Sequence, residues 1–183
     1  MAGVAVGLFV ATNLDDAFLL VGWFARGRPS SRQVIVGQYL GIGLLTVVSI
    51  ILGAAMVAVA SGWVRYLGLL PLALGVRGLV SIARGDQESE PDAPAAKGIL
   101  AVAAVTIASG ADNVSVYTPV FATLDAGALA VTALVFAILT GLWCLGANAL
   151  VDHPRVGAPL RRHGPLIASL ALVVVGLAVL LGV

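Results

Sequence analysis

Six long apolar runs constrain this chain more than any other feature of its sequence. They cover approximately residues 3–24, 34–60, 66–83, 98–121, 126–151 and 165–183. A helix of about 20 apolar residues spans the hydrocarbon core of a bilayer. Only 10% of the residues are charged, whereas soluble domains contain about 25%. The sequence therefore predicts an all-α integral membrane protein of six transmembrane helices, surrounded by the lipid bilayer.

Two short polar motifs interrupt these runs, near the middle of the first and of the fourth. The first motif contains Asn13, Asp15 and Asp16, and the second contains Asp112 and Asn113. A charged side chain at the bilayer centre costs about 2.5–3.5 kcal/mol on insertion scales. Acids inside membranes therefore usually serve a function. The structural alternative is that protonated acids only form hydrogen bonds between helices.

The charges inside the predicted spans do not balance. Of the ten Lys and Arg residues, only Arg77 lies inside a span, and its long side chain can reach the membrane surface. The three carboxylates are therefore either protonated or hold a cation. A site that is protonated when empty and neutralised by a metal when full is suited to exchange protons for cations. We expect the three carboxylates to form a cation site, with the two amides as neutral oxygen ligands.

Further polar side chains lie near the two motifs along the predicted helices. Residues three or four apart share a helix face, so Thr12 is expected beside Asp16. Pro119 cannot donate a backbone hydrogen bond, and we expect the fourth span to kink or open there. The candidate pathway residues outside the motifs are Thr12, Gln38, Thr106, Ser109, Tyr117 and Cys144. Ordinary packing explains many such Ser and Thr residues, and the cysteine is either a small core residue or a ligand for a soft metal.

The two halves of the chain, residues 1–83 and 98–183, resemble each other. A shift of 97 positions pairs Ala11 with Ala108, Thr12 with Ser109, Asp15 with Asp112, Asp16 with Asn113 and Phe24 with Phe121. Each half contains three predicted spans, so the halves must have opposite orientations in the membrane. Inverted repeats of this kind are common in secondary transporters, whose binding site lies at the midplane between the repeats. We therefore expect two inverted three-helix repeats.

Basic residues are distributed unevenly between the predicted loops. The loops after the first, third and fifth spans hold Arg26, Arg28, Arg32, Arg84, Lys97, Arg155, Arg161 and Arg162, and the opposite side holds Arg65. Basic loops face the cytoplasm, so both termini are expected outside. The segment 84–97 is rich in Pro, Gly and acids and is expected to be a cytoplasmic acidic linker.

Several classes of partner are not indicated. No basic patch with interleaved aromatic residues suggests a nucleic-acid partner, and no nucleotide-binding motif suggests an ATP-driven pump. The single cysteine allows no internal disulfide. We expect no enzymatic activity and no cofactor other than a transported ion, and a bundle of this size is compatible with a homodimer.

Together these residues resemble the cadmium-resistance transporter family, within the lysine-exporter superfamily. The stretches that carry the resemblance are 11–16, 37–41, 67–72, 106–117 with Pro119, 121–122, 143–144 and 153–154. The most distinctive part is the pair of motifs Asn-x-Asp-Asp and Gly-x-Asp-Asn. The resemblance implies a six-span exporter in the bacterial plasma (inner) membrane that confers resistance to cadmium, with the acidic motifs in its transport site. The sequence departs from it at 109–111, where a Gly-richer run is expected.

The ligand chemistry leaves the transported ion open. Carboxylates and amides suit Mn²⁺, Mg²⁺ or Ca²⁺, whereas thiols suit Cd²⁺. We expect export of a divalent heavy-metal cation, with Cd²⁺ first and Zn²⁺ or Mn²⁺ after it, by proton antiport. Three alternatives stay open: an exporter of a cationic amino acid, an intramembrane aspartyl protease that uses Asp15 and Asp112, and a structural membrane subunit. The chain contains no Gly-x-Gly-Asp sequence, which argues against the protease.

Overall fold

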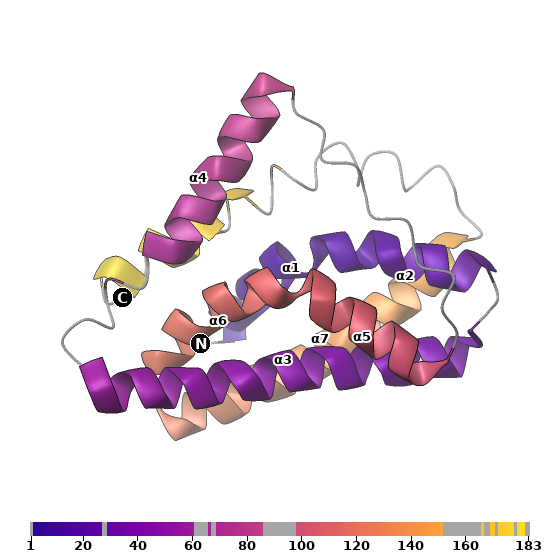
Figure 1. Cartoon of the computed structure of the whole chain (residues 1–183), viewed down its shortest axis with the longest axis horizontal. Helices are drawn as coiled ribbons and strands as arrows, with labels where there is room; N and C mark the ends of the chain where they lie inside the picture. The colour runs from indigo at the N-terminus through magenta and orange to yellow at the C-terminus, as the bar shows by residue number, and fades with distance from the viewer. Residues whose placement is uncertain are drawn as a thin grey trace.

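The computed structural model is helical throughout the part of the chain that it describes. The described residues are 2–26, 29–60, 66, 69–85, 98–151, 166, 169–170, 172–177 and 179–181. Their helices are α1 (Ala2–Thr12), α2 (Leu14–Arg26), α3 (Ser31–Ala60), α4 (Leu69–Arg84), α5 (Ile99–Ser109), α6 (Ala111–Ala122) and α7 (Ala126–Val151), followed by helical residues between 166 and 181 (Figure 1). The prediction of an all-α chain is confirmed for these residues.

Two helices are long and apolar enough to cross a membrane alone. They are residues Ser31–Ala58 of α3 and the whole of α7. Helices α5 and α6 also meet this criterion together, although they are bent by 72° at the break between them. The described residues thus contain two candidate spans, or three when the bent pair counts as one. The six-span count remains a prediction.

The outer faces of α3 and α7 are apolar. On α7 the exposed side chains recur every three or four residues, which places them on one stripe of the helix. This stripe consists of Leu134, Ile138, Leu142 and Leu145, and the corresponding exposed residues of α3 include Leu40, Leu44, Val47 and Ile51. A patch of this kind is rare on a soluble monomer, whereas lipid accommodates it. The exposed surface therefore agrees with a membrane protein.

Each of the two long helices packs against helices from the other half of the chain. Helix α3 packs chiefly against α5 and α6, and α7 packs chiefly against α1 and α2. Glycines allow the first contact: a Cβ atom added to Gly37 would lie 2.6 Å from Cβ of Val102, and one added to Gly41 would lie 2.6 Å from Cβ of Thr106. Small residues four apart let helix backbones approach closely in membranes. These glycines bring α3 against α5, the helix that carries Thr106 and Ser109.

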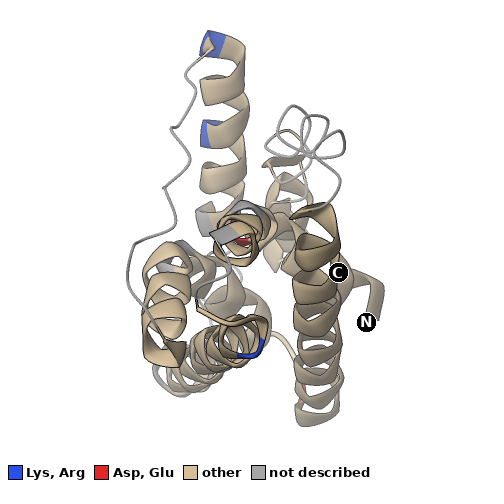
Figure 2. Cartoon of the chain, turned by 90° about the vertical axis from the view of Figure 1, so that its right-hand side faces the viewer, with Lys and Arg blue, Asp and Glu red and all other residues tan. Residues whose placement is uncertain are grey.

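Helix α4 extends away from this bundle, and its lower end lies beside the C-terminal helical residues (Figure 1). Gly75 permits this contact, because an added Cβ would lie 2.7 Å from the carbonyl oxygen of Ser169. The arginines whose side chains the structure describes, Arg32, Arg77 and Arg84, are exposed, and the blue positions in Figure 2 lie on α4 and on the bundle. Of the predicted linker 84–97, the structure describes Arg84 and Gly85, and the remainder lies outside the described residues.

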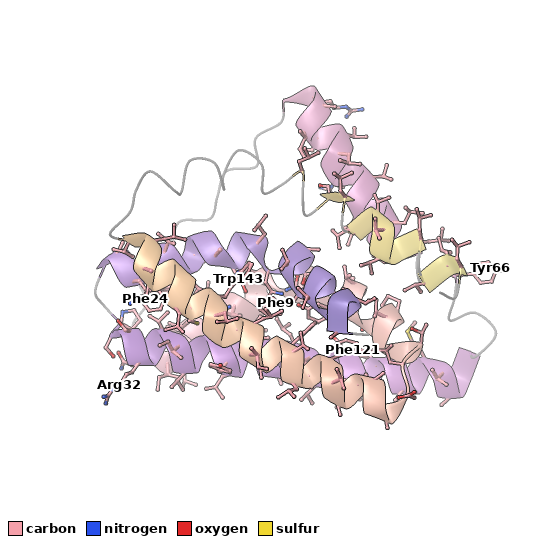
Figure 3. All side chains as sticks on the ribbon, turned by 180° about the vertical axis from the view of Figure 1, so that it is seen from behind. Phe9, Phe24, Arg32, Tyr66, Phe121 and Trp143 are labelled. Atoms are coloured by element: carbon pink, nitrogen blue, oxygen red, sulfur yellow. The ribbon has the colours of Figure 1, made fainter. Side chains whose placement is uncertain are left out.

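Two apolar clusters fill the two ends of the bundle. The first, called here the aromatic cluster, includes Phe9, Tyr117, Phe121 and Phe136. The second, called here the Trp23 cluster, includes Leu20, Trp23, Phe24, Val34, Val102 and Cys144. Figure 3 shows Phe9 and Phe121 toward one end and Phe24 toward the other, with Trp143 between them. Trp143 packs against both clusters.

Polar residues occupy the level between the two clusters on α1, α2, α3, α5 and α6, and at the break between α1 and α2. They are Thr12, Asn13 and Asp16 between Phe9 and Leu20, Gln38 between Val34 and Ile42, and Thr106, Ser109 and Asn113 between Val102 and Val116. We call these seven residues the polar layer. Because apolar side chains close the bundle on both sides of it, this layer is enclosed along the length of the molecule.

Candidate functional site

The first polar motif lies at a helix break. Helix α1 ends at Thr12 and α2 begins at Leu14, so Asn13 stands between them. Asn favours caps and turns over helix interiors, because its side chain competes for backbone groups. The backbone N–H of Asn13 still donates to the carbonyl of Phe9 at 3.0 Å, but its own carbonyl accepts from Nε1 of Trp143 at 2.8 Å. The expectation that Thr12 and Asp16 share one helix face is therefore wrong, because they lie on different helices.

The second polar motif lies at a similar break. Helix α5 ends at Ser109 and α6 begins at Ala111, with Gly110 between them. The N–H of Gly110 donates to the carbonyl of Thr106 at 2.9 Å, and its carbonyl accepts from the N–H of Asn113 at 3.1 Å. An added Cβ would collide with Leu45 and lie 2.9 Å from the Thr106 carbonyl oxygen, so close packing requires glycine here.

The predicted kink at Pro119 is not where the chain bends. Helix α6 continues from Ala111 to Ala122 with Pro119 inside it. Membrane helices tolerate proline because neighbouring groups can satisfy the freed backbone carbonyl. The opening of this segment lies nine residues earlier, at Gly110, which is the position that a shift of 97 pairs with Asn13.

Asp16 is the centre of a hydrogen-bond network that joins the two halves of the chain. Its side chain is only 2% exposed. Its Oδ2 accepts from Nε2 of Gln38 at 2.9 Å, and its Oδ1 accepts from Oγ of Ser109 at 3.0 Å. Gln38 in turn accepts at Oε1 from Oγ1 of Thr106 at 2.6 Å. The structure thus brings together four residues predicted for the site or its pathway, from α2, α3 and α5.

Asn13 is the centre of a second, neutral network. Its Nδ2 lies 2.7 Å from the hydroxyl of Tyr117, 2.9 Å from Oγ1 of Thr12 and 2.9 Å from the carbonyl oxygen of Phe9. The Thr12 and Tyr117 hydroxyls are 2.8 Å apart. Asn13 and Tyr117 are fully buried. Three predicted residues therefore meet here, at the border between the polar layer and the aromatic cluster.

The remaining predicted residues have different surroundings. Asn113 is buried in the first turn of α6, with 3% of its surface exposed. Cys144 is buried in the Trp23 cluster. The backbones of Asp15 and Asp112 lie in the first turns of α2 and α6. Their side chains fall outside the described part of the structure, so the contacts predicted for them, including a protease pair, are untested.

The donor atoms of the polar layer are mostly oxygens. They comprise a carboxylate, three amides and three hydroxyls, a set that suits a hard or borderline divalent cation. Among the described residues no group of three or more His, Cys, Asp and Glu side chains is placed to hold a metal.

Sequence reasoning did not single out Trp143 as part of the site. Its indole N–H donates to the carbonyl of Asn13 across 130 positions of sequence. Its ring also packs edge-on against Phe9, with centroids 5.7 Å apart. A tryptophan in an apolar span is typical of a core residue or an interfacial anchor. Only the tertiary contact shows that it supports the first break.

Apolar outer faces on the two long helices, with polar side chains inside the bundle, are the features of a membrane protein. The family model of cadmium resistance transporters matches residues 9–183. The chain therefore belongs to the cadmium resistance transporter family. This assignment confirms the family resemblance and identifies a transporter family, which is consistent with a protein that is not an enzyme. Comparisons with curated proteins and with solved structures gave no match.

Proposed function

We propose that this protein exports a divalent heavy-metal cation in exchange for protons, with Cd²⁺ as the first candidate and Zn²⁺ or Mn²⁺ as the next. Membership of the cadmium resistance transporter family supports cadmium as cargo. The oxygen-rich donor set of the polar layer supports a divalent cation more generally. A carboxylate-centred site can alternate between a proton and a metal ion, which is the requirement for antiport.

The observation that carries this proposal is the position of Asp16. Its carboxylate is buried between α2, α3 and α5, and each of its oxygens accepts a hydrogen bond. An arriving cation would replace hydrogen bonds with ligand bonds at these oxygens, and a proton would restore a neutral carboxyl after the ion leaves. Gln38 and Ser109 would then serve as neutral partners that hold the carboxylate in both states.

We further propose that the two halves are inverted repeats and that the cargo moves between them. Two observations support this idea. The helix breaks at Asn13 and Gly110 are related by the same shift of 97 that relates the acidic motifs. Helix α3 of the first half packs on α5 and α6 of the second half, and α7 of the second half packs on α1 and α2 of the first. This reciprocal packing is expected when a two-fold axis relates the two halves. Under this proposal the chain is a multi-pass protein of the bacterial plasma membrane with both termini outside.

Transport by protein reconstituted in liposomes tests the proposed function. We expect Cd²⁺ flux that follows an imposed pH gradient and moves protons in the opposite direction. Asp16→Asn should abolish this flux, because an amide can neither be neutralised by a metal nor take up the proton. Asp125→Asn is the matched control: Asp125 is exposed, and its Oδ1 accepts from the N–H of Ala128 at 2.8 Å at the start of α7. Asn also serves well at that capping position.

The same assay separates the alternative cargo. An exporter of cationic amino acids would carry labelled lysine, and excess lysine would inhibit Cd²⁺ flux. Flux of lysine but not of Cd²⁺ would overturn the metal proposal while leaving the transporter class intact. Equal Cd²⁺ flux in the parent protein and in Asp16→Asn would show that the carboxylate does not handle the ion.

A further inference from the structure

The amide of Asn13 has an orientation that can be deduced from its partners. The carbonyl oxygen of Phe9 is an acceptor only, and it lies 2.9 Å from the amide atom that faces it. That atom must therefore be the nitrogen Nδ2, since two oxygens would repel each other. The usual ambiguity between the two ends of an amide is thus resolved by a backbone group.

The hydroxyls beside Asn13 agree with this orientation. Thr12 donates its single proton to the carbonyl of Leu8 at 2.9 Å, so it acts as the acceptor in its 2.8 Å pair with Tyr117. The hydroxyl oxygen of Tyr117 accepts from Nδ2 of Asn13 at 2.7 Å. The two amide protons of Asn13 are therefore shared among three acceptor oxygens, which belong to Phe9, Thr12 and Tyr117.

The other end of the amide is buried without a partner. The Oδ1 atom of Asn13 has no hydrogen-bond partner among the residues that the structure describes, although the whole side chain has 0% exposure. A buried acceptor without a donor costs free energy, and such atoms are rare in native proteins. Here the atom lies at a helix break within the motif that carries two acids, and an amide carbonyl oxygen is a common ligand of divalent cations.

Tyr117 is itself rigidly held. It is fully buried, it stacks on Phe121 with ring centroids 5.6 Å apart, and it packs against Phe136 at 5.0 Å. Its hydroxyl comes from α6, in the opposite half of the chain from Asn13. The ring thus fixes a hydrogen-bond acceptor against the Asn13 amide from the other side of the site.

We propose that Tyr117 is a positioning residue of the cation site: by accepting from Nδ2 of Asn13, it keeps Oδ1 of Asn13 without a hydrogen-bond partner and available to bind the transported divalent cation. This inference rests on the proposed function. It assigns the two residues different tasks, because Asn13 contacts the ion and Tyr117 acts only through Asn13. Thr12 supports the same arrangement by accepting from both of them.

The test measures Cd²⁺ affinity by calorimetry on the full-length protein in detergent, in a double-mutant cycle. We expect Tyr117→Phe to weaken Cd²⁺ binding by about two- to tenfold, the factor that one net hydrogen bond provides. In the Asn13→Asp background the same change should alter affinity by less than about twofold. A carboxylate presents an acceptor oxygen in either orientation, so it no longer needs Tyr117.

Thr132→Val is the matched control for the loss of a buried hydroxyl. Thr132 is 5% exposed, and its hydroxyl donates to the carbonyl of Ala128 at 2.8 Å within its own helix. We expect the Cd²⁺ affinity of this variant to equal that of the parent protein. Thr12→Val is a second probe, should Tyr117→Phe fail to fold; it should weaken binding in the same direction by about twofold.

The outcomes distinguish this inference from the function on which it rests. Loss of Cd²⁺ binding in Asp16→Asn with unchanged affinity in Tyr117→Phe would overturn the positioning role alone, and Oδ1 would then be an atom that only water satisfies. Equal weakening by Tyr117→Phe in the parent protein and in the Asn13→Asp background would also overturn it, because the effect would not pass through the amide. A parent protein that binds no Cd²⁺ would overturn both proposals.

Discussion

The two helix breaks occupy corresponding places in the two halves of the chain, but they are held in different ways. At Asn13 the backbone carbonyl accepts from Trp143, and the side chain bonds to Tyr117. At Gly110 there is no side chain, and the space that one would need is filled by Leu45 and by the carbonyl of Thr106. The break at Asn13 thus depends on hydrogen bonds from distant helices, and the break at Gly110 depends on close packing that leaves no room for a side chain.

The two breaks also differ in charge. The residue three positions after Asn13 is Asp16, and the residue three positions after Gly110 is Asn113. Both side chains are buried, with 2% and 3% exposed. If the halves are related by a two-fold axis, the site contains a carboxylate on one side and an amide on the other. The comparison therefore suggests that the geometry is shared while the charge at this position is carried by one half.

Of the changes at the two breaks, exchanging the buried charge between the halves should have the largest effect, and the quantity that it changes is the affinity for Cd²⁺. We expect Asp16→Asn to weaken Cd²⁺ binding by about 100-fold, because removing one member of a buried charge pair costs about 2–5 kcal/mol. The double variant Asp16→Asn with Asn113→Asp keeps the net charge and should recover much of the lost affinity. Calorimetry on the three proteins measures both effects. Binding no better in the double variant than in Asp16→Asn would break the proposed equivalence of the two positions.

Adding a methyl group at the second break should have the next largest effect. We expect Gly110→Ala to destabilise the protein by about 2 kcal/mol, since overpacking a filled site costs about 1–3 kcal/mol. Gly146→Ala is the control, because an added Cβ there meets no atom within 4 Å, and it should cause no loss. Thermal unfolding in detergent gives the comparison. Equal melting temperatures for the two variants would contradict a break that depends on shape.

Removing the indole donor at the first break should have the smallest effect of the three. Trp143→Phe keeps an aromatic ring but loses the 2.8 Å bond to the Asn13 carbonyl, and a hydrogen bond contributes about 1 kcal/mol. Trp23→Phe makes the same change of size in the Trp23 cluster and serves as its control. The difference between their melting temperatures isolates the hydrogen bond. No difference would mean that the break is held by packing alone.

The sequence predicted the helices and much of the candidate site, because hydropathy and buried polar residues are local signals. The residues of the two hydrogen-bond networks that the sequence also predicts are Asn13, Asp16, Gln38, Thr106, Ser109 and Tyr117. The break at Asn13 was not predicted, since an asparagine in an apolar run does not by itself end a helix. The kink was assigned to Pro119 because proline is the stronger local signal, whereas the glycine break depends on the approach of Leu45 from α3. The role of Trp143 depends on a contact that no local pattern records.

A crystal structure of the protein with bound Cd²⁺, in which anomalous scattering locates the metal, tests most directly whether the polar layer is the cation site. We expect a single strong peak in the polar layer, beside the carboxylate of Asp16 and within ligand distance of Oδ1 of Asn13. A peak outside this layer, with the Asp16 carboxylate still bonded to Gln38 and Ser109, would contradict a cation site between the two halves.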